Sequence, residues 1–228
     1  MSSITADKKH LQVSELFYSI QGESSWAGYP CAFIRLTDCN LRCTYCDSSY
    51  TWKEKGHHFS YNRILEWLGH YPGVIVELTG GEPLLQENIY PFIDLLLNDG
   101  RTVLIETNGS LGIEKIPSQV SVILDIKCPD SGMADQMEWN NISRLADRRK
   151  KNCRDDIKFV VSSEHDFLWA KNIIIEYRLE EVATLLISPV DYLLAPSHLA
   201  ELLMQHMLPA KMQLQLHKLL WPEKERGV

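Results

Sequence analysis

The amino-acid sequence predicts an α/β fold in which about six parallel strands form an incomplete barrel. Short apolar runs alternate with amphipathic stretches of helical length along the 228 residues, and this alternation is typical of β–α units that build a parallel sheet. Seven runs qualify as strands, but only five stretches qualify as helices. A complete TIM-like barrel has eight of each, so we expect a partial barrel with fewer helices than strands.

The candidate strands are short runs rich in aliphatic and β-branched residues. They cover residues 32–36, 74–78, 102–106, 120–126, 157–161, 184–188 and 212–216. The candidate helices cover about 60–70, 87–99, 133–149, 164–178 and 196–207. Ser60 and Ser163 stand at N-cap positions, where a side-chain oxygen accepts from the first turn, and Gly100 stands where a C-cap is expected.

The composition is that of an ordinary globular protein, with 45% hydrophobic and 23% charged residues. No low-complexity segment or long linker divides the chain, so residues 1–228 are expected to form one domain. The net charge of −7 argues against a nucleic-acid partner and against an anionic membrane surface. No signal-peptide run or stretch approaching ~18 apolar residues is visible, and we expect a cytoplasmic protein.

Cys39, Cys43 and Cys46 lie in one short stretch, spaced x3 and x2. On a helix the first and third sulfurs would be separated by a rise of roughly 10 Å, so the stretch is predicted to be a loop wrapped around a metal centre. Thiolates favour zinc, copper(I) or iron–sulfur. A structural zinc or a fully ligated cluster needs four protein ligands, so three leave one coordination position open. The remaining cysteines are interpreted as structural and fit a reducing compartment: Cys31, Cys128 and Cys153.

Polar or glycine-rich residues follow nearly every candidate strand. The cysteine loop follows 32–36, and the segment 79–83 (Thr-Gly-Gly-Glu-Pro) follows 74–78. In parallel α/β folds, the functional site forms at the carboxyl ends of the strands. These segments are therefore expected to share one site.

The cysteine loop and the segment 79–83 together resemble the radical S-adenosylmethionine superfamily. The resemblance implies a single radical S-adenosylmethionine domain over residues 1–228. In it the three cysteines would hold a [4Fe–4S] cluster, whose fourth iron chelates the amino and carboxylate groups of S-adenosylmethionine. Gly80 and Gly81 would let the backbone approach this ligand, and the Glu82 carboxylate could partner its ammonium.

A narrower resemblance covers nearly the whole chain. Residues 17–23, 33–36, 46–52 and 215–218 are similar to the 7-carboxy-7-deazaguanine synthase family. This implies a lyase of queuosine and 7-deazapurine biosynthesis that acts on 6-carboxy-5,6,7,8-tetrahydropterin. A 5′-deoxyadenosyl radical would abstract hydrogen from C6, the ring would contract, ammonia would leave and S-adenosylmethionine would be regenerated. A Mg²⁺ ion would orient the substrate carboxylate.

The same resemblance assigns roles to individual positions. Substrate would be bound by Ile20, Gln21, Gly22, Glu23, Arg35, Thr79 and His217. S-adenosylmethionine would be bound by Tyr45, Asp47, Gly81, Glu82, Asp125, Ile126, Lys127 and Ser188. Ser48 falls at the magnesium-ligand position, where threonine is common in the family, and a serine hydroxyl can serve as an oxygen ligand.

Two departures and two alternatives accompany this interpretation. Ser24 stands where the family often has glycine, and the chain extends beyond His217, so its terminal carboxylate is expected to lie away from the active site. The implied partners are an electron donor such as flavodoxin or ferredoxin and a second copy of the chain in a homodimer. The alternatives are an activase that installs a glycyl radical on a partner protein and a non-enzymatic zinc-binding module built on the cysteine loop.

Overall fold

A computed structural model describes residues 9–151, 153–190 and 192–228. Within this part of the chain, one sheet contains nine strands in the order β3-β1-β2-β4-β5-β6-β7-β8-β9. Its strands are β1 (His10–Ile20), β2 (Pro30–Leu36), β3 (His57–Ser60), β4 (Ile75–Gly80), β5 (Val103–Thr107), β6 (Ser121–Ile126), β7 (Asp156–Val161), β8 (Thr184–Pro189) and β9 (Lys211–Met212). The pairs from β2 to β9 are parallel, whereas β1 pairs with β2 and β3 in antiparallel fashion.

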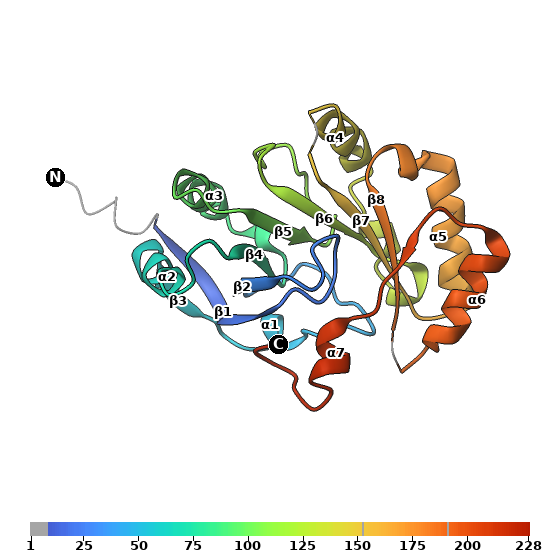
Figure 1. Cartoon of the computed structure of the whole chain (residues 1–228), viewed down its shortest axis with the longest axis horizontal. Helices are drawn as coiled ribbons and strands as arrows, with labels where there is room; N and C mark the ends of the chain where they lie inside the picture. The colour runs from blue at the N-terminus through green and yellow to red at the C-terminus, as the bar shows by residue number, and fades with distance from the viewer. Residues whose placement is uncertain (1–8, 152, 191) are drawn as a thin grey trace.

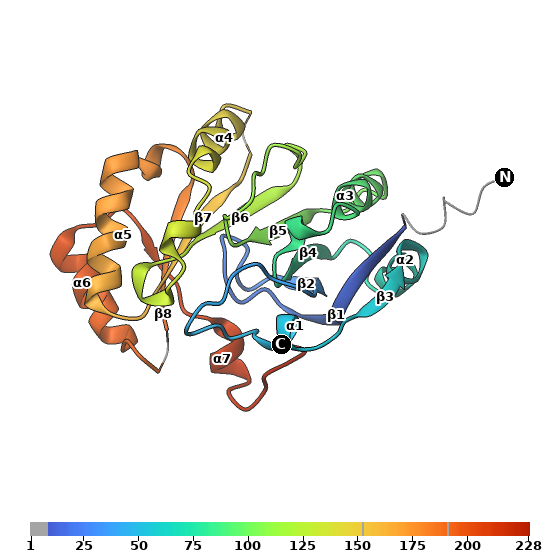
Figure 2. The same cartoon turned by 180° about the vertical axis from the view of Figure 1, so that it is seen from behind.

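Helices cover the outer face of this curved sheet (Figure 1). They are α2 (Tyr61–Leu68), α3 (Ile89–Asn98), α4 (Asn140–Arg149), α5 (Glu164–Tyr177) and α6 (Pro196–His206). Two short helices, α1 (Tyr50–Lys53) and α7 (Leu216–Leu220), lie instead on the open side, and Figure 2 shows the C-terminus beside α1 from behind. The sheet does not close into a barrel, which confirms the predicted incomplete barrel. No helix in the described ranges has the length and apolar character needed to cross a membrane.

Alternation along each strand separates two cores. Outward side chains such as Leu78, Leu124 and Phe159 pack in the main core beneath the helices. Inward side chains at the bottom of the barrel form a smaller apolar cluster around Phe33 and Leu104. Because the bottom of the interior is filled, the space available to a ligand lies above it, toward the carboxyl ends of the parallel strands.

The loop between β1 and β2, residues 21–29, spans the open side of the barrel. Ser25 donates from its backbone N–H to Asp156 of β7 at 2.7 Å. The backbone N–H and C=O of Ser24 bond both ends of the Gln213 side-chain amide, at 2.7 Å each. The loop thus ties the first half of the sheet to the last.

Most predicted elements are present, with corrections at both ends of the chain. The caps at Ser60 and Ser163 are confirmed, since each hydroxyl accepts from a backbone N–H of the first turn. Strands β1 and β3 are not among the predicted strands. In β1 the alternation of apolar and polar residues is broken because a bulge interrupts the register between Val13 and Glu15. The predicted strand 212–216 is wrong beyond Met212, since α7 begins at Leu216, and the predicted helix 133–149 is confined to α4 after a 3₁₀ turn.

Candidate active site

A cavity of about 450 Å³ opens at the carboxyl ends of the parallel strands. Its wall combines strand ends, the cysteine loop, the β1–β2 loop, α7 and the C-terminal tail. Most predicted site residues line it: Ile20, Gln21, Gly22, Glu23, Arg35, Cys39, Cys43, Tyr45, Cys46, Asp47, Ser48, Thr79, Gly81, Asp125, Lys127 and His217. Segments far apart in the sequence therefore meet in one site.

Glu82, Ile126 and Ser188 do not line this cavity. Ile126 lies on the outward face of β6 and packs in the main core. The Glu82 carboxylate is fully buried and accepts from the backbone N–H groups of Leu84, at 3.0 Å, and Asn108, at 2.7 Å, and from the Thr107 hydroxyl. Burial raises the pKa of Glu82 to about 7. Its carboxylate therefore holds the ends of β4 and β5 together.

The two glycines before Glu82 are required by backbone packing. A Cβ atom on Gly81 would lie 1.8 Å from the carbonyl oxygen of Asp38, and one on Gly80 would lie 2.3 Å from that of Leu36. Gly80 also has a φ of +123°, which L-residues rarely adopt. The end of β4 thereby lies directly against the start of the cysteine loop, a role for these glycines that the sequence did not indicate.

The three cysteines of the loop are free thiols in the cavity wall. Cys39 Sγ accepts from the Leu41 backbone N–H at 3.4 Å and lies 3.6 Å from Asn108 Nδ2. Burial raises the pKa of Cys39, and it raises that of Cys43 to about 11. These groups are therefore thiols at neutral pH until a metal displaces their protons.

As placed in the structure, the three cysteine sulfurs are not all close enough to one another to share a single zinc ion. In the ranges that the structure describes, the one set of three metal-ligand side chains with ligand atoms all within 4.8 Å is Asp130, His165 and Asp166. Two sulfurs on one zinc, with Zn–S bonds of about 2.3 Å, can be separated by at most ~4.6 Å. The cysteine sulfurs are thus spread more widely than one zinc ion bridges.

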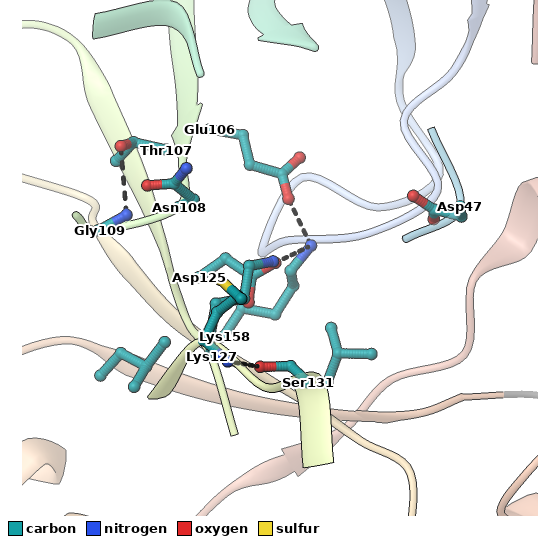
Figure 3. Close-up of polar contacts among 12 residues, drawn as sticks. Asp47, Glu106, Thr107, Asn108, Gly109, Asp125, Lys127, Ser131 and Lys158 are labelled. Carbon is teal, nitrogen blue, oxygen red and sulfur yellow. Dashed lines mark hydrogen bonds and ion pairs between the residues drawn. The ribbon is translucent and has the colours of Figure 1, made fainter. Parts of the chain in front are cut away.

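Opposite the cysteines, a buried lysine joins three strand ends and the β1–β2 loop. Lys158 is 3% exposed. Its Nζ lies 2.8 Å from Glu23 Oε2. It also lies 3.5 Å from Asp125 Oδ2 and pairs with Glu106 (Figure 3). Lys127 Nζ lies 2.8 Å from Asp125 as well. Lys158 and His217 lower the pKa of Glu23, although burial alone would raise it.

Below this lysine, Glu77 supports the substrate-side loop. Its Oε2 accepts from the Gln21 side-chain amide at 2.5 Å, and the Gln21 side-chain oxygen accepts from the backbone N–H of Glu23. Burial, reinforced by the nearby Glu106 carboxylate, raises the pKa of Glu77 to about 8. Glu77 is therefore mostly protonated at neutral pH, and both ends of the Gln21 amide are engaged within the protein.

Sequence reasoning missed Glu15, Glu77, Glu106 and Lys158. The last three are charged residues at inward positions of otherwise apolar strands, and that pattern is the signal that could have identified them. Glu15 lies in a strand that was not predicted. It accepts from Arg35 Nε at 2.8 Å.

The C-terminal segment reaches the cavity through a helix and not, as predicted, through a strand. His217 belongs to α7, and a Cβ on Gly22 would lie 2.7 Å from its Nδ1, so the absence of a side chain at Gly22 lets the imidazole lie directly against the β1–β2 loop. Burial lowers the pKa of His217. The tail folds back, and Val228 lines the cavity. The expectation that the extension keeps the chain end away from the site is wrong, because the tail turns back after α7.

Comparisons with known proteins identify the family. Residues 33–125 match the model of the Radical SAM superfamily. The 7-carboxy-7-deazaguanine synthase of Chlorobaculum tepidum is 41% identical over 96% of this chain and 97% of its own length. That of Koribacter versatilis is 38% identical over 96% of this chain and its full length. This chain belongs to the 7-carboxy-7-deazaguanine synthase family.

The fold agrees with this family. The crystal structure of QueE from Escherichia coli superposes with a TM-score of 0.73, at 21% identity, over 90% of this chain and 94% of that one. As a radical S-adenosylmethionine enzyme, this family member uses a [4Fe–4S] cluster and S-adenosylmethionine.

The site residues of this family member fit both groups. Three thiols converge on one cavity, and none is engaged in a disulfide. Among the side chains that the structure describes, Asp125 Oδ1 and Ser188 Oγ are buried polar atoms without a hydrogen-bond partner. Buried polar atoms are normally paired, so Asp125 Oδ1, in the cavity wall, is suited to a polar group of a bound cofactor, whereas Ser188 lies behind that wall. Ser48 adds a hydroxyl to the wall beside Asp47, an oxygen-rich setting of the kind that Mg²⁺ prefers.

Proposed function

We propose that this protein converts 6-carboxy-5,6,7,8-tetrahydropterin to 7-carboxy-7-deazaguanine with loss of ammonia, as a radical S-adenosylmethionine carbon–nitrogen lyase. The observation that carries the proposal is the meeting, in one cavity, of the three-cysteine loop with Arg35, Thr79, His217 and the β1–β2 loop. A cavity of about 450 Å³ is also of the size that small-molecule sites have.

The bound groups would supply a 5′-deoxyadenosyl radical that abstracts a hydrogen atom from the pterin. The cluster ligands are Cys39, Cys43 and Cys46, and the magnesium ligand is Ser48. Tyr45, Asp47, Gly81, Glu82, Asp125, Ile126, Lys127 and Ser188 would surround S-adenosylmethionine, with Glu82, Ile126 and Ser188 acting from behind the wall. Ile20, Gln21, Gly22, Glu23, Arg35, Thr79 and His217 would hold the pterin.

The charges of the chain suit this substrate. Arg35 presents a guanidinium, which binds a carboxylate in a bidentate manner. The lowered pKa of His217 keeps its imidazole neutral near pH 7, so it can donate or accept a hydrogen bond at the pterin edge. The β1–β2 loop is held from below by Glu77 and from the side by Lys158, so its shape does not depend on substrate.

The remaining features of the proposal concern the setting of the enzyme. Residues 1–228 would act as a single radical S-adenosylmethionine domain in the cytoplasm. A low-potential electron donor such as flavodoxin or ferredoxin would reduce the cluster, and two copies of the chain would form a homodimer. The product would enter queuosine or another 7-deazapurine route.

The test is a product assay with anaerobically reconstituted protein. Reduced protein, S-adenosylmethionine, Mg²⁺ and the carboxytetrahydropterin are combined, and 7-carboxy-7-deazaguanine and ammonia are measured. We expect both products to form in equal amounts, with S-adenosylmethionine recovered. An intact cluster that cleaves S-adenosylmethionine but yields no deazapurine would overturn the proposal.

A further inference from the structure

A β-bulge places Glu15 directly opposite Arg35. The pairing of β1 with β2 shifts between Val13, which faces Leu36, and Glu15, which faces Arg35. A bulge of this kind re-aims the side chain that follows it and is often found next to a functional site. Without the bulge, the strict alternation of the strand would turn residue 15 to the other face of the sheet.

Three hydrogen bonds converge on the Glu15 carboxylate. Arg35 Nε donates to Oε1 at 2.8 Å, and the Tyr50 hydroxyl donates to the same oxygen at 2.7 Å. The backbone N–H of Gly227, in the C-terminal tail, donates to Oε2 at 3.1 Å. The side chains of Arg35 and Glu15 are only 16% and 17% exposed, so this pair is shielded more than a surface ion pair.

The contact with Glu15 uses one edge of the guanidinium and leaves the other free. Within the described part of the chain, Arg35 donates a hydrogen bond to the protein only from Nε, to Glu15. Its two terminal nitrogens donate no hydrogen bond to these residues. The guanidinium also lies 5.2 Å from the centre of the Phe17 ring, which limits its rotation from one side. Arg35 lines the cavity, so its remaining donors are available to a ligand there.

We propose that Glu15 is a positioning residue for substrate binding, which holds Arg35 at Nε so that its terminal nitrogens meet the substrate carboxylate together. This rests on the proposed function, in which the substrate carries that carboxylate. An arginine side chain loses rotamer freedom when it is fixed in one geometry, and fixing it before binding removes that entropic cost from the binding step. Tyr50 and the tail fix Glu15 in turn.

The test measures KM and kcat for the carboxytetrahydropterin in a double-mutant cycle between Glu15→Ala and Arg35→Lys. Lysine keeps the charge but has neither Nε nor the planar fork. We expect Glu15→Ala to raise KM about tenfold, in keeping with the loss of a hydrogen bond to a charged group, with a smaller change in kcat. In the Arg35→Lys background, Glu15→Ala should raise KM little further, because its effect acts through the fork.

Conservative variants separate positioning from a general loss of structure. Glu15→Gln keeps an acceptor for Arg35 Nε, so it should restore most of the KM lost in Glu15→Ala. Tyr50→Phe removes one donor that fixes Glu15 and should raise KM by a smaller factor. Glu87→Gln is the matched control, because Glu87 is an exposed partner of Lys115 outside the cavity, and its kinetics should be unchanged.

The outcomes distinguish this inference from the function on which it rests. The positioning role is wrong, and the proposed function stands, if wild-type protein makes the deazapurine but Glu15→Ala has an unchanged KM. The same conclusion follows if the factors by which the two substitutions raise KM multiply in the double variant. If wild-type protein cleaves S-adenosylmethionine and yields no deazapurine, the proposed function fails and takes this role with it. Equal losses in Glu15→Ala and Glu15→Gln would also contradict a role based on the hydrogen bond to Nε.

Discussion

On one side of the cavity, the sulfur of Cys39 has two long contacts, at 3.4 and 3.6 Å. On the other side, the ammonium of Lys158 contacts three carboxylates and is almost completely buried. We call these the cysteine side, which comprises Cys39, Cys43 and Cys46, and the ionic side, which comprises Glu23, Glu77, Glu106, Asp125 and Lys158. Both lie at the same sheet edge, yet only on the ionic side do charged groups of the protein pair with one another.

Under the proposed function, the difference separates the groups that would bind the cluster from groups that are already paired within the protein. The cysteine thiols gain their main interactions only when a metal replaces their protons. The ionic side is paired in the protein alone, because a buried charge without a partner is costly. Changes on the cysteine side should therefore remove chemistry and spare the fold, whereas changes on the ionic side should affect both.

The largest expected effect is that of Cys43→Ala. Loss of one of three thiolates should prevent stable cluster binding and abolish product formation. The midpoint of thermal unfolding of the metal-free protein should hardly change, since among the described residues the Cys43 thiol makes no side-chain hydrogen bond. Iron and acid-labile sulfide analysis, the product assay and metal-free thermal unfolding measure these three quantities.

Cys153→Ala is the matched control for that experiment. Cys153 is buried outside the cavity and its sulfur contacts the backbone oxygen of Ser118 at 3.1 Å. It should keep the iron and the activity of the wild-type protein. A Cys43→Ala protein with a full cluster would contradict the assignment of the cysteine side.

Lys158→Met should have the opposite effect to Cys43→Ala: it should lower stability and leave cluster binding intact. Removing the cation leaves Glu23 and Glu106 without an ion-pair partner and Asp125 with Lys127 alone, and breaking a buried ion pair typically costs about 3–5 kcal/mol. Urea unfolding of the metal-free protein should show this loss, and turnover should fall by about two orders of magnitude because the β1–β2 loop loses its anchor. Iron content should remain near that of the wild-type protein.

A surface lysine provides the comparison. Lys115→Met breaks the exposed pair with Glu87, which should cost less than ~1 kcal/mol. Equal losses of stability in the two variants would mean that the ionic side does not support the fold.

The next largest expected effect is that Glu77 makes the free energy of unfolding depend on pH. The carboxyl group of an unfolded glutamate titrates near 4.5, whereas the pKa of folded Glu77 is about 8. Between these values the folded protein holds a proton that the unfolded chain has lost, so the free energy of unfolding falls as pH rises. This contribution is fully present below about pH 4.5 and is lost as pH passes through about 8.

Glu77→Gln removes that titration and keeps an uncharged side chain of the same shape. The free energy of unfolding of this variant, relative to wild type, should therefore increase with pH across this window, by a few kcal/mol at most. Urea unfolding at several pH values measures the difference. A constant difference between the two proteins would show that Glu77 is not protonated in the folded state.

The cysteine side could be predicted from sequence and the ionic side largely could not, for a physical reason. Cluster ligands must lie close together on one loop, so their spacing appears directly in the chain. The partner of Lys158 in the β1–β2 loop is 135 residues away, and the Gly227–Glu15 bond spans 212 residues. Such pairs follow from strand order and from the return of the tail, neither of which a local pattern contains.

The fold shows the same distinction between local and distant determinants. The parallel strands and the capped helices have local signatures, and they were predicted to within a few residues. Strand β1 lacks a period-two pattern because its bulge breaks the alternation, and the five residues of α7 are of mixed character and too few to fix a period. The bulge that hid β1 is also the feature that turns Glu15 toward Arg35, so the failed pattern marks a position in the site.

The smallest expected effect lies at the edge of the ionic side, where Ser24 departs from the glycine that is common in the family. Ser24 has a φ of +64°, which costs an L-residue about 1–2 kcal/mol. Gln213 bonds both its N–H and its C=O, and these two bonds hold the unusual conformation. Gln213→Ala should therefore lower the free energy of unfolding by about 1–2 kcal/mol, whereas the exposed Gln136→Ala should change it little.

Adding Ser24→Gly to Gln213→Ala should recover about 0.5 kcal/mol, since glycine adopts this φ without strain but loses more chain entropy on folding. Urea unfolding measures all three, and a further loss in the double variant would show that losing the Trp26 N–H bond to the Ser24 hydroxyl, at 3.1 Å, outweighs the relief of strain.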